Sequence, residues 1–165
     1  MSDRAVPVVE WPTVLDLYAE LRRIVEALEI SGIPYALAGG LVVSIYTTPR
    51  ATEDIDLLMD HAALARAVAA LAPVGFPPTG SPIRVAGGRL EIQRLTKIDG
   101  ADLLPLDLLL PVDPGFTAIL DDRVAVNIEG ARLWMVGIRG LRALKRLGGS
   151  AQDRADLEAL GPEPA

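Results

Sequence analysis

Two aspartates separated by one residue are the feature of this sequence that most directly suggests chemistry. Asp54 and Asp56 open an otherwise apolar run, with Ile55 between them and Leu57 after them. Alternate side chains of a β-strand point to the same face, so both carboxylates would lie side by side. Two such acids repel each other unless a cation lies between them, and clustered carboxylate oxygens suit magnesium. The spacing indicates either a metal site or a strand that begins at the sheet rim with both acids in solvent.

A third acid, Asp107, stands alone in a later aliphatic run over residues 103–110. A lone charged residue among leucines usually belongs to an ion pair or to a functional site. Glu91 also has apolar neighbours, but its segment alternates with polar residues, so we predict that Glu91 lies on a solvated face. Asp107 is therefore the preferred candidate to join Asp54 and Asp56.

A pair of glycines, Gly39-Gly40, stands between a predicted strand over 35–38 and a predicted helix over 41–46. Glycine lets the backbone approach a ligand closely, and the N-terminus of a helix offers free amides to a phosphate. The spacing matches neither the Walker loop nor the GxGxxG fingerprint. A purely structural turn is the alternative interpretation of these glycines.

The remaining pattern predicts the elements that must position these residues. Helical spacing predicts a first helix capped by Thr13 and stopped by Ser31-Gly32. Further helices are predicted over 62–71, 116–120, 138–147 and 152–160, and further strands over 83–86, 89–95, 103–110, 124–128 and 132–136, the first two joined at Gly87-Gly88. This order predicts an α/β (α+β) fold, a mixed sheet flanked by helices. We expect one domain over 1–165, with a core at about 14–136 and a C-terminal helical part at about 137–160.

Composition narrows the classes of function. Half of the 165 residues are hydrophobic and the formal net charge is −6, which argues against broad, non-specific binding to nucleic acid. The absence of cysteine excludes disulfides, thiolate metal sites and cysteine nucleophiles. No apolar run is long enough to span a membrane and no signal pattern opens the chain, so we expect a cytoplasmic protein.

Together these motifs resemble the nucleotidyltransferase superfamily of the polymerase-beta type. The resemblance rests on Gly39-Gly40, the run Asp54-Ile55-Asp56-Leu57, and the later Leu106-Asp107-Leu108. The run over 49–56, Pro-Arg-Ala-Thr-Glu-Asp-Ile-Asp, is similar to that of a small prokaryotic branch related to abortive-infection, type IV toxin–antitoxin nucleotidyltransferases.

The C-terminal part is also similar to that branch, over residues 144–147 and 153–158. One departure is Gln152, which stands where such sequences often carry a lysine. The resemblance extends from about Val14 to Leu160 and so covers nearly the whole chain.

The resemblance implies a role for each motif. Asp54 and Asp56 would hold two magnesium ions that bridge the phosphates of a nucleoside triphosphate, and Asp107 would contact the metal nearer the acceptor and help to deprotonate its hydroxyl. The backbone amides of Gly39 and Gly40 would hold the β- and γ-phosphates.

Three further residues would assist with the nucleotide. Ser44 offers a hydroxyl near the glycines, Arg50 lies in a loop that can reach the triphosphate, and Lys145 can extend from a C-terminal helix. A plain salt bridge is the alternative for Arg50, and a solvated helix face is the alternative for Lys145.

The implied activity is magnesium-dependent transfer of a nucleoside monophosphate to an unidentified hydroxyl acceptor, with release of pyrophosphate. The acceptor would be a small molecule, a protein or a tRNA. The alternative is a non-catalytic nucleotide- or partner-binding module of a toxin–antitoxin-type system, with a partner protein. The sequence leaves the oligomeric state open.

The other conspicuous residues are assigned structural roles. We predict a surface or capping role for His61, packing roles for Trp11 and Trp134, and arginine partners for Asp153 and Asp156. A basic group near the C-terminus could contact a polynucleotide, but we favour simple solvation of a helix; its members are Arg139, Arg142, Lys145, Arg146 and Arg154.

Overall fold

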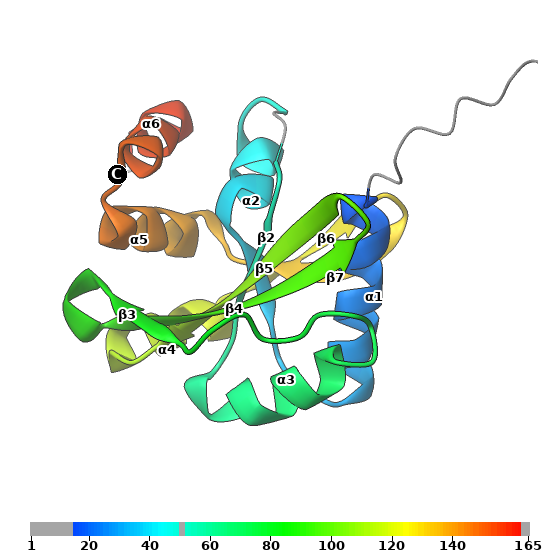
Figure 1. The fold of residues 1–165 in the computed structure, drawn as a ribbon. Coiled ribbons are helices and arrows are strands. Elements are labelled where there is room, and N and C mark those ends of the chain that lie inside the picture. The colour runs from blue at the N-terminus through cyan, green and yellow to red at the C-terminus, as the bar shows by residue number, and fades with distance from the viewer. Residues whose placement is uncertain (1–14, 50–51, 163–165) are drawn as a thin grey trace, which may run out of the picture.

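A seven-stranded mixed sheet forms the centre of the computed structural model, which describes residues 15–49 and 52–162 (Figure 1). The strand order is β3-β4-β5-β2-β1-β7-β6. The strands are β1 Ala36–Ala38, β2 Ile55–Leu58, β3 Ile83–Val85, β4 Leu90–Asp99, β5 Asp102–Pro111, β6 Val124–Ile128 and β7 Ala131–Met135. The mixed sheet with flanking helices confirms the predicted α+β fold.

Helices cover the sheet in two groups. The helices are α1 Leu17–Ile30, α2 Gly39–Tyr46, α3 Leu64–Leu71, α4 Pro114–Asp121, α5 Ile138–Gly148 and α6 Ala151–Leu160, with two 3-10 turns at His61–Ala63 and Ala86–Gly88. α1 packs against α3, whereas α2 contacts both C-terminal helices, which lie above the sheet in Figure 1. In the part of the chain that the structure describes, no helix combines the length and the apolar character needed to cross a lipid bilayer.

The core is aliphatic and lies against β2 and β5. Ile55 and Leu57 of β2 and Leu106 and Leu108 of β5 are completely buried. Because side chains alternate along a strand, the residues between and beside them face the opposite side of the sheet. Burial of the leucines therefore fixes the direction in which the neighbouring acids point.

The first helix begins later than predicted. Asp16 is its N-cap, and one carboxylate oxygen accepts hydrogen bonds from the backbone N–H groups of Tyr18 and Ala19 at 3.1 and 3.3 Å. Thr13, the predicted cap, lies outside the described residues.

The longest hairpin is β4–β5, which the sequence did not predict. It turns at Gly100-Ala101, and its register runs from Asp99 opposite Asp102 to Leu90 opposite Pro111. The predicted strand ended at Leu95, and several of the residues that follow it are polar. In the structure one of them, Lys97, points toward α1, where its Nζ lies 2.9 Å from Glu20 Oε2.

Candidate active site

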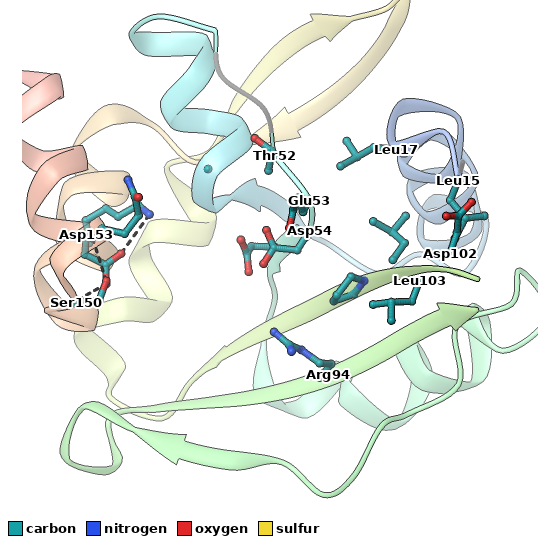
Figure 2. A pocket seen from close by; sticks show the side chains of 16 residues that line it. Leu15, Leu17, Thr52, Glu53, Asp54, Arg94, Asp102, Leu103, Ser150 and Asp153 are labelled. Carbon is teal, nitrogen blue, oxygen red and sulfur yellow. Dashed lines mark hydrogen bonds and ion pairs between the residues drawn. The ribbon is translucent and has the colours of Figure 1, made fainter. Parts of the chain in front are cut away.

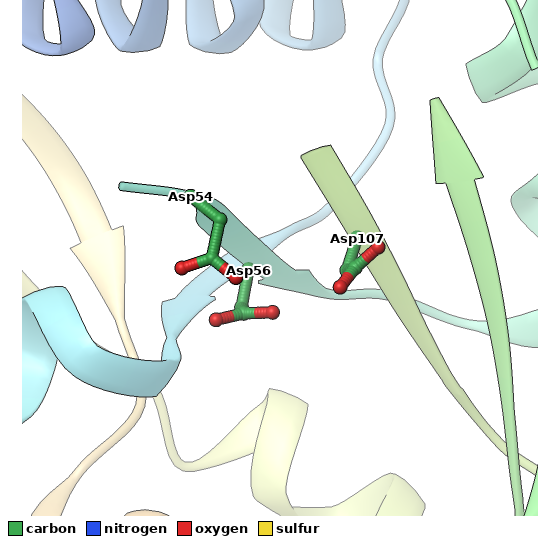
Figure 3. Close-up of side chains that lie close together, drawn as sticks. All are labelled: Asp54, Asp56 and Asp107. Atoms are coloured by element: carbon green, nitrogen blue, oxygen red, sulfur yellow. The ribbon is translucent and has the colours of Figure 1, made fainter. Parts of the chain in front are cut away.

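The two strands β2 and β5 bring the three predicted acids together. They pair in parallel with Asp56 directly opposite Asp107, and Asp54 precedes Asp56 by two residues. Each of the three acids offers one carboxylate oxygen to a group in which all oxygens lie within 4.8 Å of one another (Figure 3). The spacing that suggested a common face in the sequence therefore gives a compact cluster in space.

The middle acid of the cluster is difficult to ionise. Burial, and then the negative charges of Asp54 and Asp107, raise the pKa of Asp56 to about 7. The positive charges of Lys145 and Arg94 oppose this shift only in part. A cation bound between the three carboxylates would favour the ionised form of Asp56 and lower its pKa again.

Arg94 is a residue of the site that the sequence did not identify. It lies opposite Asp107 across the β4–β5 hairpin, and the two form a bidentate ion pair, with Nε 2.8 Å from Oδ1 and the second guanidinium nitrogen 3.0 Å from Oδ2. The hydrogen bond and charge of Asp107 raise the pKa of Arg94 further. Recognising the turn at Gly100-Ala101 would have revealed the pair, since equal counts back from a hairpin turn identify facing residues.

Gly39 lets the helix begin directly beside the acids. Its φ is +70°, and a Cβ at this position would overlap the carboxylate of Asp56. Gly40 lines the same pocket as Asp56. The glycine pair thus combines a left-handed turn with a close approach to an acid, so it is more than a plain structural turn.

Of the two other predicted phosphate contacts, the structure describes only Ser44. Ser44 lies in the second turn of α2, where its hydroxyl donates a hydrogen bond to the carbonyl oxygen of Gly40 at 3.0 Å, and it is not among the described residues that line the pocket. Arg50 lies outside the described residues.

Lys145 reaches the pocket from α5 and also joins the two C-terminal helices. Its Nζ lies 2.8 Å from Asp156 Oδ2 and 3.2 Å from Asp153 Oδ1, both on α6. The structure therefore gives both acids a lysine partner where the sequence predicted arginines. Gln152, which stands where the resemblance predicts a lysine, donates a hydrogen bond to Asp156 at 2.8 Å and lines the pocket.

The pocket around the acids has a volume of about 1000 Å³ and two different ends (Figure 2). The polar end is formed by residues of α2, α5 and α6 and by the N-cap of α6: Gly40, Lys145, Gln152, Asp153 and Ser150. The apolar end is formed by residues before and at the start of α1 and of β5: Leu15, Leu17, Leu103, Leu104 and Pro105. Figure 2 shows Asp54 between these two ends. Asp56 also lines the pocket, whereas Asp107 is not among the described residues that line it.

Two predictions outside the pocket were wrong. The side chain of Glu91 is only 13% exposed, and its Oε2 lies 3.4 Å from His61 Nε2 and 3.6 Å from Arg84 Nε. The edge strand β3 and the turn before α3 supply these partners, so Glu91 does not lie on a solvated face. Arg142 is buried rather than solvated, because it donates hydrogen bonds to the carbonyl oxygens of Leu160 and Gly161 at the end of α6.

His61 and Trp134 have the surroundings that were predicted. His61 is about half exposed and opens a 3-10 turn that Asp60 caps. Trp134 is partly buried against the core, with the guanidinium groups of Arg123 and Arg132 at 4.8 and 5.7 Å from its ring. Trp11 lies outside the described residues.

Comparison with known proteins gives matches of structure only. No family model matches the chain, and no curated protein matches its sequence. The TM1012 protein of Thermotoga maritima is similar with a TM-score of 0.60 and 11% identity, over 88% of this chain and 93% of that one.

Two antibiotic-modifying enzymes are also similar. The lincosamide antibiotic adenylyltransferase LnuA, bound to lincomycin, has a TM-score of 0.54 and 15% identity over 86% of this chain and 94% of its own. ANT(2")-Ia, in complex with adenylyl-2"-tobramycin, has a TM-score of 0.56 and 12% identity over 86% of each chain. These likenesses confirm the predicted architecture: the chain has the nucleotidyltransferase fold.

Proposed function

We propose that the protein is a magnesium-dependent nucleotidyltransferase that transfers a nucleoside monophosphate from a nucleoside triphosphate to a hydroxyl acceptor. The observation that carries this proposal is the cluster of Asp54, Asp56 and Asp107 within 4.8 Å, beside the helix that Gly39 opens. In the reaction the acceptor oxygen attacks the α-phosphorus, the bond from that phosphorus to the bridging oxygen of the β-phosphate breaks, and pyrophosphate leaves.

The residues present fit magnesium. All three are carboxylates, the hard oxygen ligands that this ion prefers. Burial, and then the two neighbouring acids, raise the pKa of Asp56, and a cation bound here would favour its ionised form. Asp107 can accept hydrogen bonds from Arg94 and still offer a lone pair to a cation, because each carboxylate oxygen has two. Two ions bound here would neutralise charge on the phosphates and stabilise the attacking and leaving oxygens.

We assign the carboxylates different roles according to their positions in the sheet. Asp54 and Asp56 of the β2 edge would hold the ions on the triphosphate side. Asp107 lies on β5, the strand that also carries Leu103 and Pro105 of the apolar end, and would orient the attacking hydroxyl and receive its proton. Arg94 fixes the plane of the Asp107 carboxylate through the bidentate pair, which positions that oxygen.

The polar end of the pocket suits the triphosphate. Amides at the N-terminus of α2, at Gly39 and Gly40, supply donors for anionic oxygens. Lys145 adds positive charge beside them. A phosphate contact by Ser44 would require its hydroxyl to exchange its bond to Gly40, and a contact by Arg50 stays a prediction.

A small-molecule acceptor is the form of the proposal that we favour over a protein or a tRNA. Two similar structures hold lincomycin and adenylyl-2"-tobramycin. A pocket of about 1000 Å³ is at the upper end of the range that encloses small ligands, so it has room for a nucleotide and a compact second substrate.

The test is label transfer from each of the four α-labelled triphosphates, with magnesium and a panel of hydroxylated small molecules, proteins and tRNA. We expect transfer by the unmodified protein and none by Asp56→Asn. Asp60→Asn is the matched control, because Asp60 caps a turn outside the pocket and asparagine can still cap it. Transfer that survives Asp56→Asn would contradict the proposal.

A binding measurement does not depend on finding the acceptor. Magnesium with a bound triphosphate at 100 times its dissociation constant should stabilise the fold by about 2.7 kcal/mol. The same measurement on Asp56→Asn should show little stabilisation. The absence of a shift with all four triphosphates would count against the proposed activity.

A further inference from the structure

The apolar end of the pocket is formed by residues around the start of α1 and by β5, the strand that also carries the third acid. We define the apolar shelf as Leu15, Leu17, Leu103 and Pro105, which all line the pocket. Leu103 is 62% exposed although it is a large aliphatic residue on a strand. Exposed apolar surface next to polar groups that could do chemistry is typical of a ligand site.

The register of the β4–β5 hairpin places the shelf on the same face as Asp107. Leu103, Pro105 and Asp107 alternate along β5, so their side chains point to one side of the sheet. At about 3.4 Å per residue, Pro105 lies about 7 Å and Leu103 about 14 Å along the strand from Asp107. A molecule whose hydroxyl reaches Asp107 would therefore lay its body on the shelf.

The polar groups around the shelf are negative. Glu53, Asp54 and Asp102 line the pocket together with the shelf. Of the two cations among the described lining residues, Arg94 pairs with Asp107, and Lys145 lies at the polar end of the pocket instead of at the shelf. A phosphate-bearing acceptor would meet repulsion here, whereas a neutral or cationic one would not.

We infer that the acceptor is an uncharged or cationic small molecule whose apolar body lies on the shelf formed by Leu15, Leu17, Leu103 and Pro105, with its hydroxyl at Asp107. This inference rests on the proposed function, because it takes Asp107 as the acid on the acceptor side. It goes beyond the fold, because it depends on the side chains that form the shelf.

Calorimetry in magnesium buffer tests the inference by measuring the affinities of three probes that share a naphthylmethyl group. They are the neutral 2-naphthalenemethanol, the cationic (2-naphthylmethyl)trimethylammonium and the anionic 2-naphthylmethanesulfonate. We expect the neutral and cationic probes to bind and the sulfonate to bind at least tenfold more weakly. Leu103→Gln should weaken the first two by about tenfold, which corresponds to the contribution of one buried leucine.

Ile83→Gln is the matched control, because Ile83 is 59% exposed on another strand and lies outside the pocket. It should leave all three affinities unchanged. Equal binding of the sulfonate, no binding of any probe, or equal effects of the two substitutions would overturn the inference. A dimer in sedimentation velocity that Leu103→Gln dissociates would assign the shelf to a second copy and would also overturn it.

Binding of Mn²⁺, followed by electron paramagnetic resonance in the same samples, separates the two levels of the argument. Suppose that the unmodified protein binds Mn²⁺, that Asp56→Asn abolishes this binding, and that Leu103→Gln leaves the affinities for the probes unchanged. This result would overturn the acceptor inference alone. Failure of the unmodified protein to bind Mn²⁺ would overturn the proposed function, whichever probes bind at the shelf.

Discussion

Three carboxylates that repel one another are stable only because their surroundings compensate in part. Ionisation of Asp56 is unfavourable, since burial and two neighbouring acids raise its pKa to about 7. Asp107, which is proposed as a metal ligand, forms an ion pair with the guanidinium of Arg94. At the residue scale, the site can therefore be tested by changing one charge at a time.

The pH dependence of stability should report Asp56. Its pKa is higher in the folded than in the unfolded protein, so the folded state binds more protons between pH 4 and 7 and loses stability as the pH rises through about 7. One pKa unit corresponds to about 1.4 kcal/mol, so the metal-free protein should lose a few kcal/mol over this range relative to Asp56→Asn.

Urea unfolding at pH 5 and pH 8 in the presence of a chelator measures this difference. Asp56→Asn should be the more stable protein at pH 8. In a second measurement, with Mn²⁺ in place of the chelator, the ion should stabilise only the unmodified protein. If the stability difference between the two proteins were the same at both pH values, the pKa of Asp56 would not be raised.

Removing the guanidinium of Arg94 should separate metal binding from turnover. Arg94→Gln removes a positive charge beside the acids, so Mn²⁺ should bind several times more tightly. Asp107 also loses its bidentate partner, and a less fixed carboxylate should lower kcat at least tenfold with a smaller change in KM.

Arg84→Gln is the control for this substitution, since Arg84 pairs with Glu91 on the neighbouring strand and does not line the pocket. It should change neither Mn²⁺ affinity nor kcat. Weaker Mn²⁺ binding by Arg94→Gln would show that Arg94 supports the metal site instead of competing with the metal for Asp107.

At the scale of elements, sequence patterns predicted what depends on local alternation. The acids of β2 and the lone acid of β5 stand out because each interrupts an aliphatic run, and burial of Ile55 and Leu106 sets their direction. Arg94 could not be predicted in the same way, because its role depends on the register across a hairpin whose turn was not recognised. The prediction that Glu91 is solvated was wrong for a related reason, because its partners come from β3 and from the turn before α3.

Gly39 lies at the junction of β1 and α2, where we expect substitution to reduce both stability and Mn²⁺ binding. Gly39→Ala would place a methyl group on the carboxylate of Asp56 and would also hold alanine at a φ of +70°. We expect a loss of several kcal/mol in the free energy of unfolding, of which the backbone accounts for about 1 to 2 kcal/mol, and a loss of Mn²⁺ binding.

Gly32→Ala provides a control with the same backbone conformation. Gly32 has a φ of +67°, but nothing lies within 4 Å of a Cβ added there. It should cost only the backbone contribution and leave Mn²⁺ affinity unchanged. Equal losses of stability and equal Mn²⁺ binding in the two variants would mean that Gly39 matters for the turn alone.

At the scale of the whole molecule, the pocket joins parts of the chain that are far apart in sequence. The sheet supplies the acids, the start of α1 and the β4–β5 hairpin supply the apolar end, and α5 and α6 supply the polar end. Lys145 joins that polar end to the rest of the site through its pairs with α6 and its effect on Asp56. Its position on α5 links the stability of the C-terminal helices to the proposed binding of nucleotide.

Lys145→Met should affect both properties. It leaves Asp156, which is buried, without its lysine partner, and breaking a buried pair costs about 3 to 5 kcal/mol. Lys97→Met is a matched substitution, because Lys97 forms a similarly buried pair with Glu20 of α1, with lysine side chains 18% and 12% exposed for Lys97 and Lys145. Both variants should lose comparable stability in urea, but only Lys145→Met should lose stabilisation by magnesium and triphosphate. If Lys97→Met lost that stabilisation to the same extent, Lys145 would act through general stability and not through the nucleotide.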